Sequence, residues 1–118
     1  MYIDAKDLRI GNYTMTDGKI NRIDYNFEIT DDHKGIFLSE ELIIKMGWVW
    51  NEECKCYEKF PDGNANTMLH FVDVSNSYTM FNYVSKIKIR ERIFFVHQLQ
   101  NLYYALTGKE LNGIQKPF

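Results

Sequence analysis

Apolar residues near the C-terminus recur at intervals of three and four. This stripe is formed by Val96, Leu99, Tyr103 and Leu106, and it is widened by Phe95 and Leu102. Such spacing is typical of one face of an amphipathic α-helix. Gly108 then ends the pattern, because glycine readily takes the left-handed conformation that closes many helices. The sequence therefore predicts a helix over about 95–107.

In the middle of the chain the apolar pattern mostly has a period of two, which is typical of strands. The strongest signal is Asp17-Gly18, a turn dipeptide between extended residues 13–16 and 19 onward, and it predicts a hairpin. Further strands are expected in the segments 23–29, 36–38, 48–50, 54–60, 67–74 and 78–89. A change of phase beyond the hairpin turn predicts a bulge or bend near Asn21 and Arg22.

A second, shorter helix is predicted between these strands. Ser39 is a favourable N-cap, and Glu40 and Glu41 place negative charge on the first turn, where the helix dipole favours it. Gly47 follows as a residue that can take the left-handed conformation. A helix of two turns over about 39–46 is expected.

Together these elements indicate an α+β fold in a single domain over residues 1–118, with 112–118 as a loose tail. The main expectation is a curved antiparallel sheet or partly open barrel of about 5–7 short strands, with both helices packed on it. An SH3-like small barrel with a C-terminal helix is the alternative. A chain of 118 residues can bury a hydrophobic core without crosslinks.

Composition and charge narrow the classes of function. The chain is 45% hydrophobic and 15% aromatic, with a formal net charge of -2. No global positive field attracts nucleic acid or an anionic membrane, so such binding would have to be local. No run of about eighteen apolar residues predicts a membrane span, and Met1 leads into no leader-like segment. We expect a cytoplasmic protein that does not contact membranes.

The only two cysteines, Cys54 and Cys56, lie two residues apart. On a strand this spacing puts both side chains on one face, but the loop is too tight for ordinary disulfide geometry, so free thiols are expected. A structural zinc site commonly takes four ligands, and the chain adds only three scattered histidines, His33, His70 and His97. The sequence therefore predicts no metal site and no cofactor.

One flank of the predicted C-terminal helix carries polar side chains that could recognise a partner. His97, Asn101 and Tyr104 lie three and four residues apart, so an imidazole, a carboxamide and a phenol line the same flank. In the alternative, which we favour, His97 and Gln100 hydrogen-bond strand backbone beneath the helix. The helix is then principally a lid on the core, and its outer flank is the best candidate for recognition.

A basic series precedes this helix and consists of Lys86, Lys88, Arg90 and Arg92. Residues 90–92 are expected to form a short charged connection. With aromatic residues nearby, the series could contact single-stranded nucleic acid through charge and stacking. A solvated strand face is the plainer interpretation, so nucleic-acid binding is kept as an alternative.

Other conspicuous side chains favour structural interpretations. The cluster at 31–33, Asp-Asp-His, lies in a predicted turn, where Asp commonly hydrogen-bonds backbone. His70 falls within a predicted strand and is typical of a packed or surface residue. Trp48 and Trp50 would share one face of a strand, either as core or, if exposed, as a contact surface.

No catalytic motif occurs, neither G-x-S-x-G nor H-E-x-x-H nor a Gly-rich loop that opens a helix. We therefore expect a small non-enzymatic protein-interaction or accessory module with an unidentified protein partner. The alternative is a nucleic-acid-associated protein that uses the basic series, and an enzyme acting on a small molecule comes third. An exposed edge strand would be compatible with a homodimer.

The two ends of the chain carry a resemblance. "DLRIGNY" at 7–13 and "VHQLQNLYYALTGKEL" at 96–111 resemble a set of short uncharacterised proteins of gut anaerobic bacteria, often encoded near phage-like or mobile elements. The likeness also covers the exit of the shorter helix at 42–48, and the middle differs. The resemblance implies a shared fold and a mobile-element setting. It carries over no catalytic residues, because the set has no established activity.

Overall fold

The computed structural model describes residues 8–9, 12–16, 19–23, 34–60 and 66–111. The chain clusters into two compact units. The terminal unit comprises Met1–Phe37 together with Phe95–Phe118, and the central unit comprises Leu38–Phe94. That residues 1–118 act as a single domain stays a prediction, and the expected tail at 112–118 lies outside the described residues.

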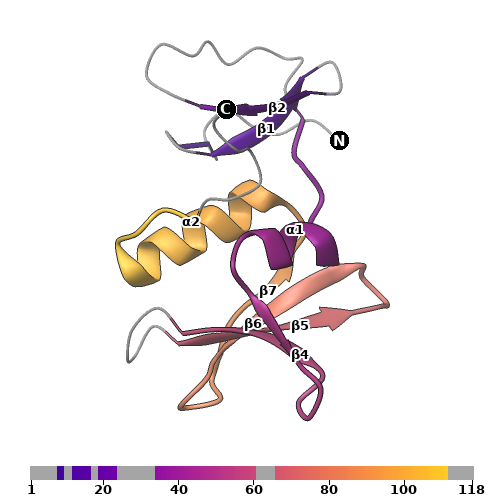
Figure 1. The fold of residues 1–118 in the computed structure, drawn as a ribbon, viewed down its shortest axis with the longest axis vertical. Helices are drawn as coiled ribbons and strands as arrows, with labels where there is room; N and C mark the ends of the chain where they lie inside the picture. The colour runs from indigo at the N-terminus through magenta and orange to yellow at the C-terminus, as the bar shows by residue number, and fades with distance from the viewer. Residues whose placement is uncertain (1–7, 10–11, 17–18, 24–33, 61–65, 112–118) are drawn as a thin grey trace. The chain divides into compact units, whose positions relative to one another are not determined.

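In the terminal unit, β1 (Tyr13–Thr16) and β2 (Lys19–Arg22) form the hairpin that the sequence predicted (Figure 1). They pair antiparallel in regular register from Tyr13↔Arg22 to Thr16↔Lys19. No bulge interrupts the pairing at Asn21 and Arg22, so that alternative of the prediction is wrong. β2 ends at Arg22, so Ile23 no longer has to follow the phase of the strand.

The long helix α2 (Val96–Thr107) belongs to the same unit and confirms the prediction over 95–107. It begins after Phe95, whose backbone N–H donates to Gln98 Oε1 over 3.1 Å. It ends at Gly108, which takes a φ of +74° and donates its N–H to the Tyr104 carbonyl over 2.8 Å. The left-handed glycine thus satisfies one of the carbonyls that a helix end leaves without a partner.

Polar side chains join α2 to the segment around β1. Gln100 Oε1 accepts the backbone N–H of Tyr13 over 2.8 Å, and Gln100 Nε2 donates to the Leu111 carbonyl over 3.1 Å. Asn101 Oδ1 accepts from Asn12 Nδ2 over 2.8 Å and from Arg9 Nε over 3.0 Å. The three bonds to Arg9, Asn12 and Tyr13 connect residues about ninety positions apart, so they fix the two ends of the chain to each other.

The apolar stripe of α2 is buried at Phe95, Val96, Leu99 and Tyr103, whereas Leu102 is partly buried and Leu106 is exposed. The buried side chains of the terminal unit include Tyr13, Ile23, Ile36, Phe95, Val96, Leu99, Tyr103 and Leu111. Leu106, which the sequence placed in the stripe, is 37% exposed. The stripe is therefore shorter than predicted, because the final turn of the helix turns Leu106 toward solvent.

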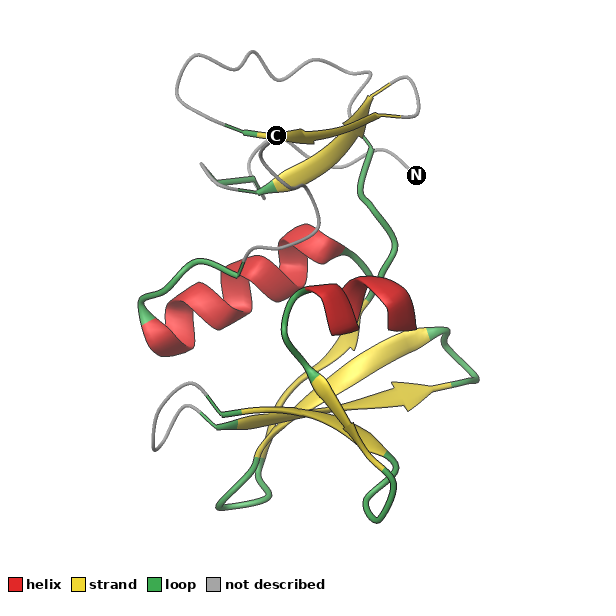
Figure 2. Cartoon of the chain, in the orientation of Figure 1, coloured by secondary structure: helices red, strands yellow, loops and turns green. Residues whose placement is uncertain are grey.

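The central unit contains α1 (Glu40–Lys45) and a five-stranded antiparallel sheet in the order β3-β4-β5-β6-β7 (Figure 2). The strands are β3 (Val49–Asn51), β4 (Cys56–Lys59), β5 (Thr67–Val72), β6 (Ser77–Asn82) and β7 (Lys88–Ile93). Figure 1 shows that this sheet is strongly twisted, and it is not closed: β3 and β7 are its edges. The α+β prediction is confirmed.

Residues 36–38 are not the strand that was expected, because only Phe37 forms an isolated bridge, with Phe95. Of the strand expected over 23–29, residues 24–29 lie outside the described residues. Three further expectations about the strands need correction. The strands divide between two sheets instead of forming one. The segment 78–89 is not a single strand, because residues 83–85 form a turn between β6 and β7. Residues 90–92 belong to β7 and are not a connection between elements. The pairing of β6 with β7 is irregular there, because its register shifts on both sides of Met80.

The shorter helix begins and ends as predicted. Ser39 Oγ accepts the backbone N–H of Leu42 over 3.2 Å, and Gly47 has a φ of +98°. Ile43 and Met46 turn inward with Trp48, which follows the helix. Neither α1 nor α2 is long and apolar enough to span a lipid bilayer, a finding that applies to the described residues.

Gln100 should be a principal source of stability in the terminal unit. Gln100→Ala would leave a buried N–H and a buried carbonyl without partners, at about 1–3 kcal/mol each, so we expect a loss of about 2–6 kcal/mol in the free energy of unfolding. Chemical denaturation followed by circular dichroism measures it. The control Lys109→Ala removes an exposed side chain from the segment between α2 and Leu111, so it should change the free energy of unfolding little. An equal loss of stability in both variants would contradict this role for Gln100.

Candidate functional site

Strand register gathers aromatic side chains on one face of the five-stranded sheet. Trp50 pairs with Tyr57 across β3 and β4, and Phe71 pairs with Tyr78 across β5 and β6. Directly opposite residues project to the same face. The rings of Trp50 and Tyr57 have centroids 4.9 Å apart, and those of Phe71 and Tyr78 are 5.2 Å apart. Two aromatic pairs therefore stand on neighbouring strand pairs of one sheet.

These four residues line a shallow hollow of about 500 Å³, which we call the aromatic hollow. Its walls are Leu38, Ser39, Glu40, Trp50, Lys55, Tyr57, Phe71, Asn76 and Tyr78. Lys55 and Asn76 close two hairpin turns, and both have the positive φ, 56° and 52°, that turns a chain sharply. The turns β3–β4 and β5–β6 thus form part of the rim. A volume of this size suits a side chain or a short peptide segment.

A carboxylate lies beside the rings. Glu40, in the first turn of α1, hydrogen-bonds the side chain of Tyr57. Burial raises the pKa of the Tyr57 hydroxyl far above its ordinary value, and the Glu40 hydrogen bond and charge raise that pKa further. Burial likewise raises the pKa of Tyr78, with a smaller contribution from Glu40. Both phenols therefore stay protonated, and Glu40 provides the negative charge of the hollow.

The charges on the rim at β3 balance each other. Trp50 Nε1 donates to Glu52 Oε2 over 2.7 Å, and Lys55 forms an ion pair with Glu52. The ion pair with Lys55 lowers the pKa of Glu52, and the hydrogen bond from Trp50 lowers it further. Lys55 is thus neutralised by Glu52, which leaves Glu40 to set the sign of the field inside the hollow.

The two tryptophans differ sharply in exposure. Trp48 is 1% exposed and belongs to the core, whereas Trp50 is 42% exposed at the hollow. They do not form a pair on one strand face, because β3 begins only at Val49. Phe71 is exposed as well. Large exposed aromatic side chains around a hollow are typical of contact surfaces.

The predicted recognition flank of α2 contacts the chain itself. His97 is buried, with its ring 5.5 Å from that of Phe95. Asn101 accepts hydrogen bonds from Arg9 and Asn12, and the Arg9 guanidinium lies 4.4 Å above the Tyr104 ring. Tyr104 remains half exposed. As the sequence analysis anticipated, Gln100 bonds strand backbone, and the flank mainly joins α2 to the N-terminal segment.

The basic series lies at the β7 edge of the sheet. Lys86, Lys88, Arg90 and Arg92 are all exposed. Lys86 Nζ lies 4.2 Å from the centroid of the Tyr83 ring, and Lys88 Nζ is 3.3 Å from a carboxylate oxygen of Glu91. The four cations come from the turn before β7 and from β7 itself, so they do not form one regular strand face.

The expectation of free thiols is wrong, because Cys54 and Cys56 form a disulfide with a Cα–Cα distance of 5.4 Å. The prediction assumed that both residues lie on a strand. Instead, β4 begins only at Cys56, and the positive φ of Lys55 bends the chain between the cysteines. A Cα–Cα distance of 5.4 Å falls within the usual range for disulfides.

His70 lies on the opposite face of the sheet and lines a second hollow of about 420 Å³. Its walls are Met68, His70, Val72, Thr79, Phe81 and Lys86. The His70 ring meets the Phe81 ring edge-on, with centroids 5.2 Å apart. Neither a thiol nor a carboxylate belongs to the described walls, so His70 lacks the partner that acid–base or nucleophilic chemistry would need there. The cluster at 31–33 lies outside the described residues.

Sequence reasoning identified Trp50 and missed Tyr57, Phe71 and Tyr78 as parts of one site. Each is an ordinary strand aromatic when taken alone. The available signal was hairpin geometry, since short turns at 52–55 and 73–76 place residue 50 opposite 57 and residue 71 opposite 78. No protein-family model, curated protein or solved structure matches the chain.

His70 should titrate below the ordinary histidine range, because burial lowers its pKa. The unfolded chain, in which histidine has a pKa of about 6.5, then takes up the proton more readily than the folded protein. Stability is therefore complete above about pH 7 and falls as the pH drops through the unfolded pKa toward the lower folded value. NMR titration of the His70 ring measures the pKa, and His70→Gln should reduce the loss of stability between pH 7.5 and 5.5. A His70 pKa above 6.5 would refute the burial argument.

Proposed function

We propose that the protein is a small non-enzymatic interaction module that binds a protein partner through the aromatic hollow. The observation that carries the proposal is the exposed pair Trp50 and Phe71 beside the buried phenols Tyr57 and Tyr78. Aromatic rings offer a large contact area at low entropic cost, and tryptophan and tyrosine dominate the energetically important positions of interfaces. The partner's chemistry follows from the charge of the hollow.

The occupant we propose is a lysine or arginine side chain on an exposed segment of the partner. Aromatic faces carry partial negative charge and attract cations placed within about 6 Å of the ring centre. Glu40 adds a full negative charge at the wall. Lys55 does not oppose the ligand strongly, because Glu52 neutralises it. A cage of rings with one carboxylate thus favours a basic side chain over an acidic or neutral one.

We further propose a cellular setting for this protein. We place the protein in the cytoplasm of a bacterial host of a phage-like or mobile element, as the resemblance of its two ends implies. Its role there would be accessory, through binding. A homodimer through the β3 or β7 edge stays a prediction, and it is compatible with a ligand in the hollow.

Binding can be tested with a lysine- and arginine-containing peptide and a matched peptide in which those residues are replaced by glutamine. We expect the basic peptide to change the fluorescence of Trp50 and to bind at least about tenfold more tightly, since cation–π contacts contribute about 0.5–2 kcal/mol each. Glu40→Gln should weaken it, and Trp50→Ala with Phe71→Ala should abolish it.

The matched control is Val74→Ala, an exposed apolar residue in the β5–β6 turn that does not line the hollow. It should bind like the unaltered protein. Equal affinity for the basic and glutamine peptides would contradict the proposed ligand. Full binding by the Trp50→Ala, Phe71→Ala variant would remove the aromatic hollow as the site.

A second candidate function is binding of single-stranded nucleic acid at the β7 edge. Its supporting observation is the exposed Lys86 stacked on Tyr83, beside Lys88, Arg90 and Arg92. Cations along a strand with an adjacent ring can follow a phosphate backbone and stack a base. The net charge of -2 and the Lys88–Glu91 ion pair weaken this alternative, which we rank below the protein-interaction proposal.

The two candidates respond differently to substitution. If the β7 edge binds nucleic acid, single-stranded DNA or RNA should bind at about 50 mM salt and dissociate steeply as salt rises. Replacing Lys86, Lys88 and Arg90 by Glu should then abolish binding, whereas Trp50→Ala should leave it intact. Absence of binding at about 50 mM salt would exclude this function.

A further inference from the structure

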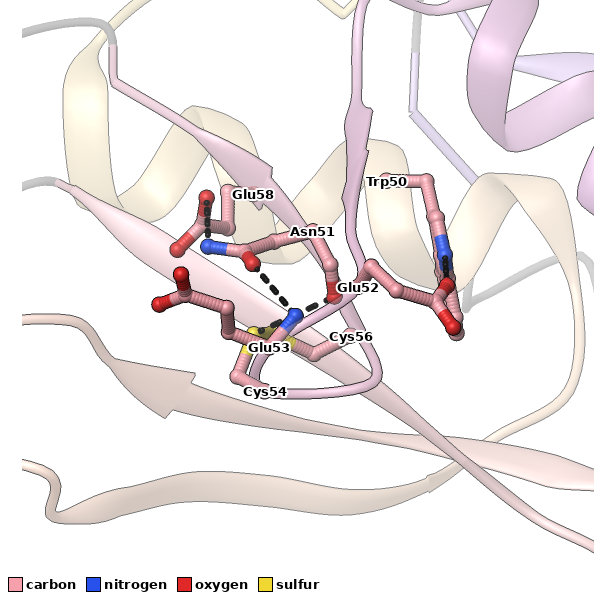
Figure 3. The surroundings of a disulfide bond; sticks show 7 residues. All are labelled: Trp50, Asn51, Glu52, Glu53, Cys54, Cys56 and Glu58. Carbon is pink, nitrogen blue, oxygen red and sulfur yellow. Dashed lines mark hydrogen bonds between the residues drawn. A yellow bond between two sulfur atoms is a disulfide. The ribbon is translucent and has the colours of Figure 1, made fainter.

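We propose that the reduced protein binds one zinc ion through Cys54, Cys56 and Glu58, and that the Cys54–Cys56 disulfide is the closed form of this site. One ligand atom from each of the three residues lies within 4.8 Å of the others. Figure 3 shows the two sulfurs and the carboxylate of Glu58 on the same side of the β3–β4 hairpin. This site is independent of the aromatic hollow, which lies on the other face of the sheet.

The backbone brings the three ligands together. Cys56 and Glu58 are alternate residues of β4, so their side chains leave the same face of the sheet. Cys54 reaches that face because the chain turns back at Lys55. Two thiolates bound to a tetrahedral zinc ion stand about 3.8 Å apart, given Zn–S bonds of about 2.3 Å. Ligand atoms already within 4.8 Å therefore need only small rotations once the disulfide opens.

The carboxylate of Glu58 is buried and held in place. Glu58 is 8% exposed, and Asn51 Nδ2 donates to its Oε1 over 3.0 Å. Asn51 is itself fixed, because its Oδ1 accepts the Glu53 backbone N–H over 2.9 Å. No described lysine or arginine lies within ion-pair distance of Glu58. A buried carboxylate without a cation is costly, and a zinc ion would supply the charge that the described residues do not.

Asn51 therefore plays the orienting part that outer hydrogen-bond partners commonly play at metal sites. Its side chain directs the carboxylate, and its backbone carbonyl lies 3.8 Å from Cys54 Sγ. Two thiolates and one carboxylate suit zinc better than the hard cations magnesium and calcium. Three protein ligands leave a fourth position of the tetrahedron for water.

The disulfide spans only one intervening residue, so it removes little entropy from the unfolded chain and is not required for the stability of the fold.

A dithiol reductant would open the disulfide in two steps. One reductant thiolate attacks Sγ of Cys54, the less buried cysteine, and expels the Cys56 thiolate; the second reductant thiol then closes the reductant's own disulfide and releases Cys54. Two electrons and two protons pass to the protein. Zinc then displaces the two thiol protons.

The test uses the full chain, reduced with a phosphine and freed of reductant without oxygen, and Co²⁺ as a spectroscopic substitute for zinc. We expect one Co²⁺ per chain with a thiolate-to-cobalt charge-transfer band, displaced by Zn²⁺. The disulfide form should show no such band. Competition with a chromophoric chelator should show that Glu58→Gln weakens zinc binding at least about tenfold, the lower bound for losing even an outer partner of a metal site. Glu53→Gln, an exposed neighbour, should bind normally.

X-ray absorption of the zinc-loaded unaltered chain needs no substitution and should report two sulfur ligands per zinc. Four sulfurs would mean that two chains share the metal and would overturn the proposed ligand set. Equal zinc affinity of the reduced and disulfide forms would do the same, as would equal affinity of the Glu58→Gln and Glu53→Gln variants. None of these readouts depends on peptide binding at the aromatic hollow.

Discussion

Strand register in the central sheet is the constraint on which both proposed sites depend. Side chains alternate between the two faces of a strand, so a slip of one residue would exchange every inward and outward position. The observed register pairs Trp50 with Tyr57 and Phe71 with Tyr78 on one face. The same register places Cys56 and Glu58 on the other face. A single pattern of backbone hydrogen bonds thus places the aromatic hollow on one face of the sheet and the side chains of Cys56 and Glu58 on the other.

The terminal unit rests on a different interaction, the buried polar contacts around Gln100 and Asn101. Their partners Tyr13 and Asn12 lie almost a full chain length away, so these bonds form only after both ends have been brought together. Closing such a long loop is slow, because its entropic cost comes before any contact compensates for it. We therefore expect the central hairpins to form early and α2 to complete its contacts late.

Local signals explain which elements the sequence predicted well. The period of the α2 stripe, the Ser39 cap, Gly47, Gly108 and the Asp-Gly turn each act within a few residues, and the helices and the first hairpin followed from them. The division of 78–89 between two strands was missed, because its alternating pattern continues through the turn. The disulfide was missed because it depends on the φ of Lys55, which composition does not reveal. The aromatic hollow needed strand pairing, a property of partners that lie apart in sequence.

The two proposals describe complementary uses of one small sheet. As proposed, the hollow would recognise charge through its rings and Glu40, whereas the cysteine site would respond to redox state through a disulfide that spans only one intervening residue. Both proposals depend on the strand register of the five-stranded sheet. Its most direct test is a set of NMR proximity measurements on the full chain. We expect ring-to-ring contacts between Trp50 and Tyr57 and between Phe71 and Tyr78. Contacts of Trp50 with Glu58 in place of Tyr57 would indicate a one-residue slip and would contradict the observed register.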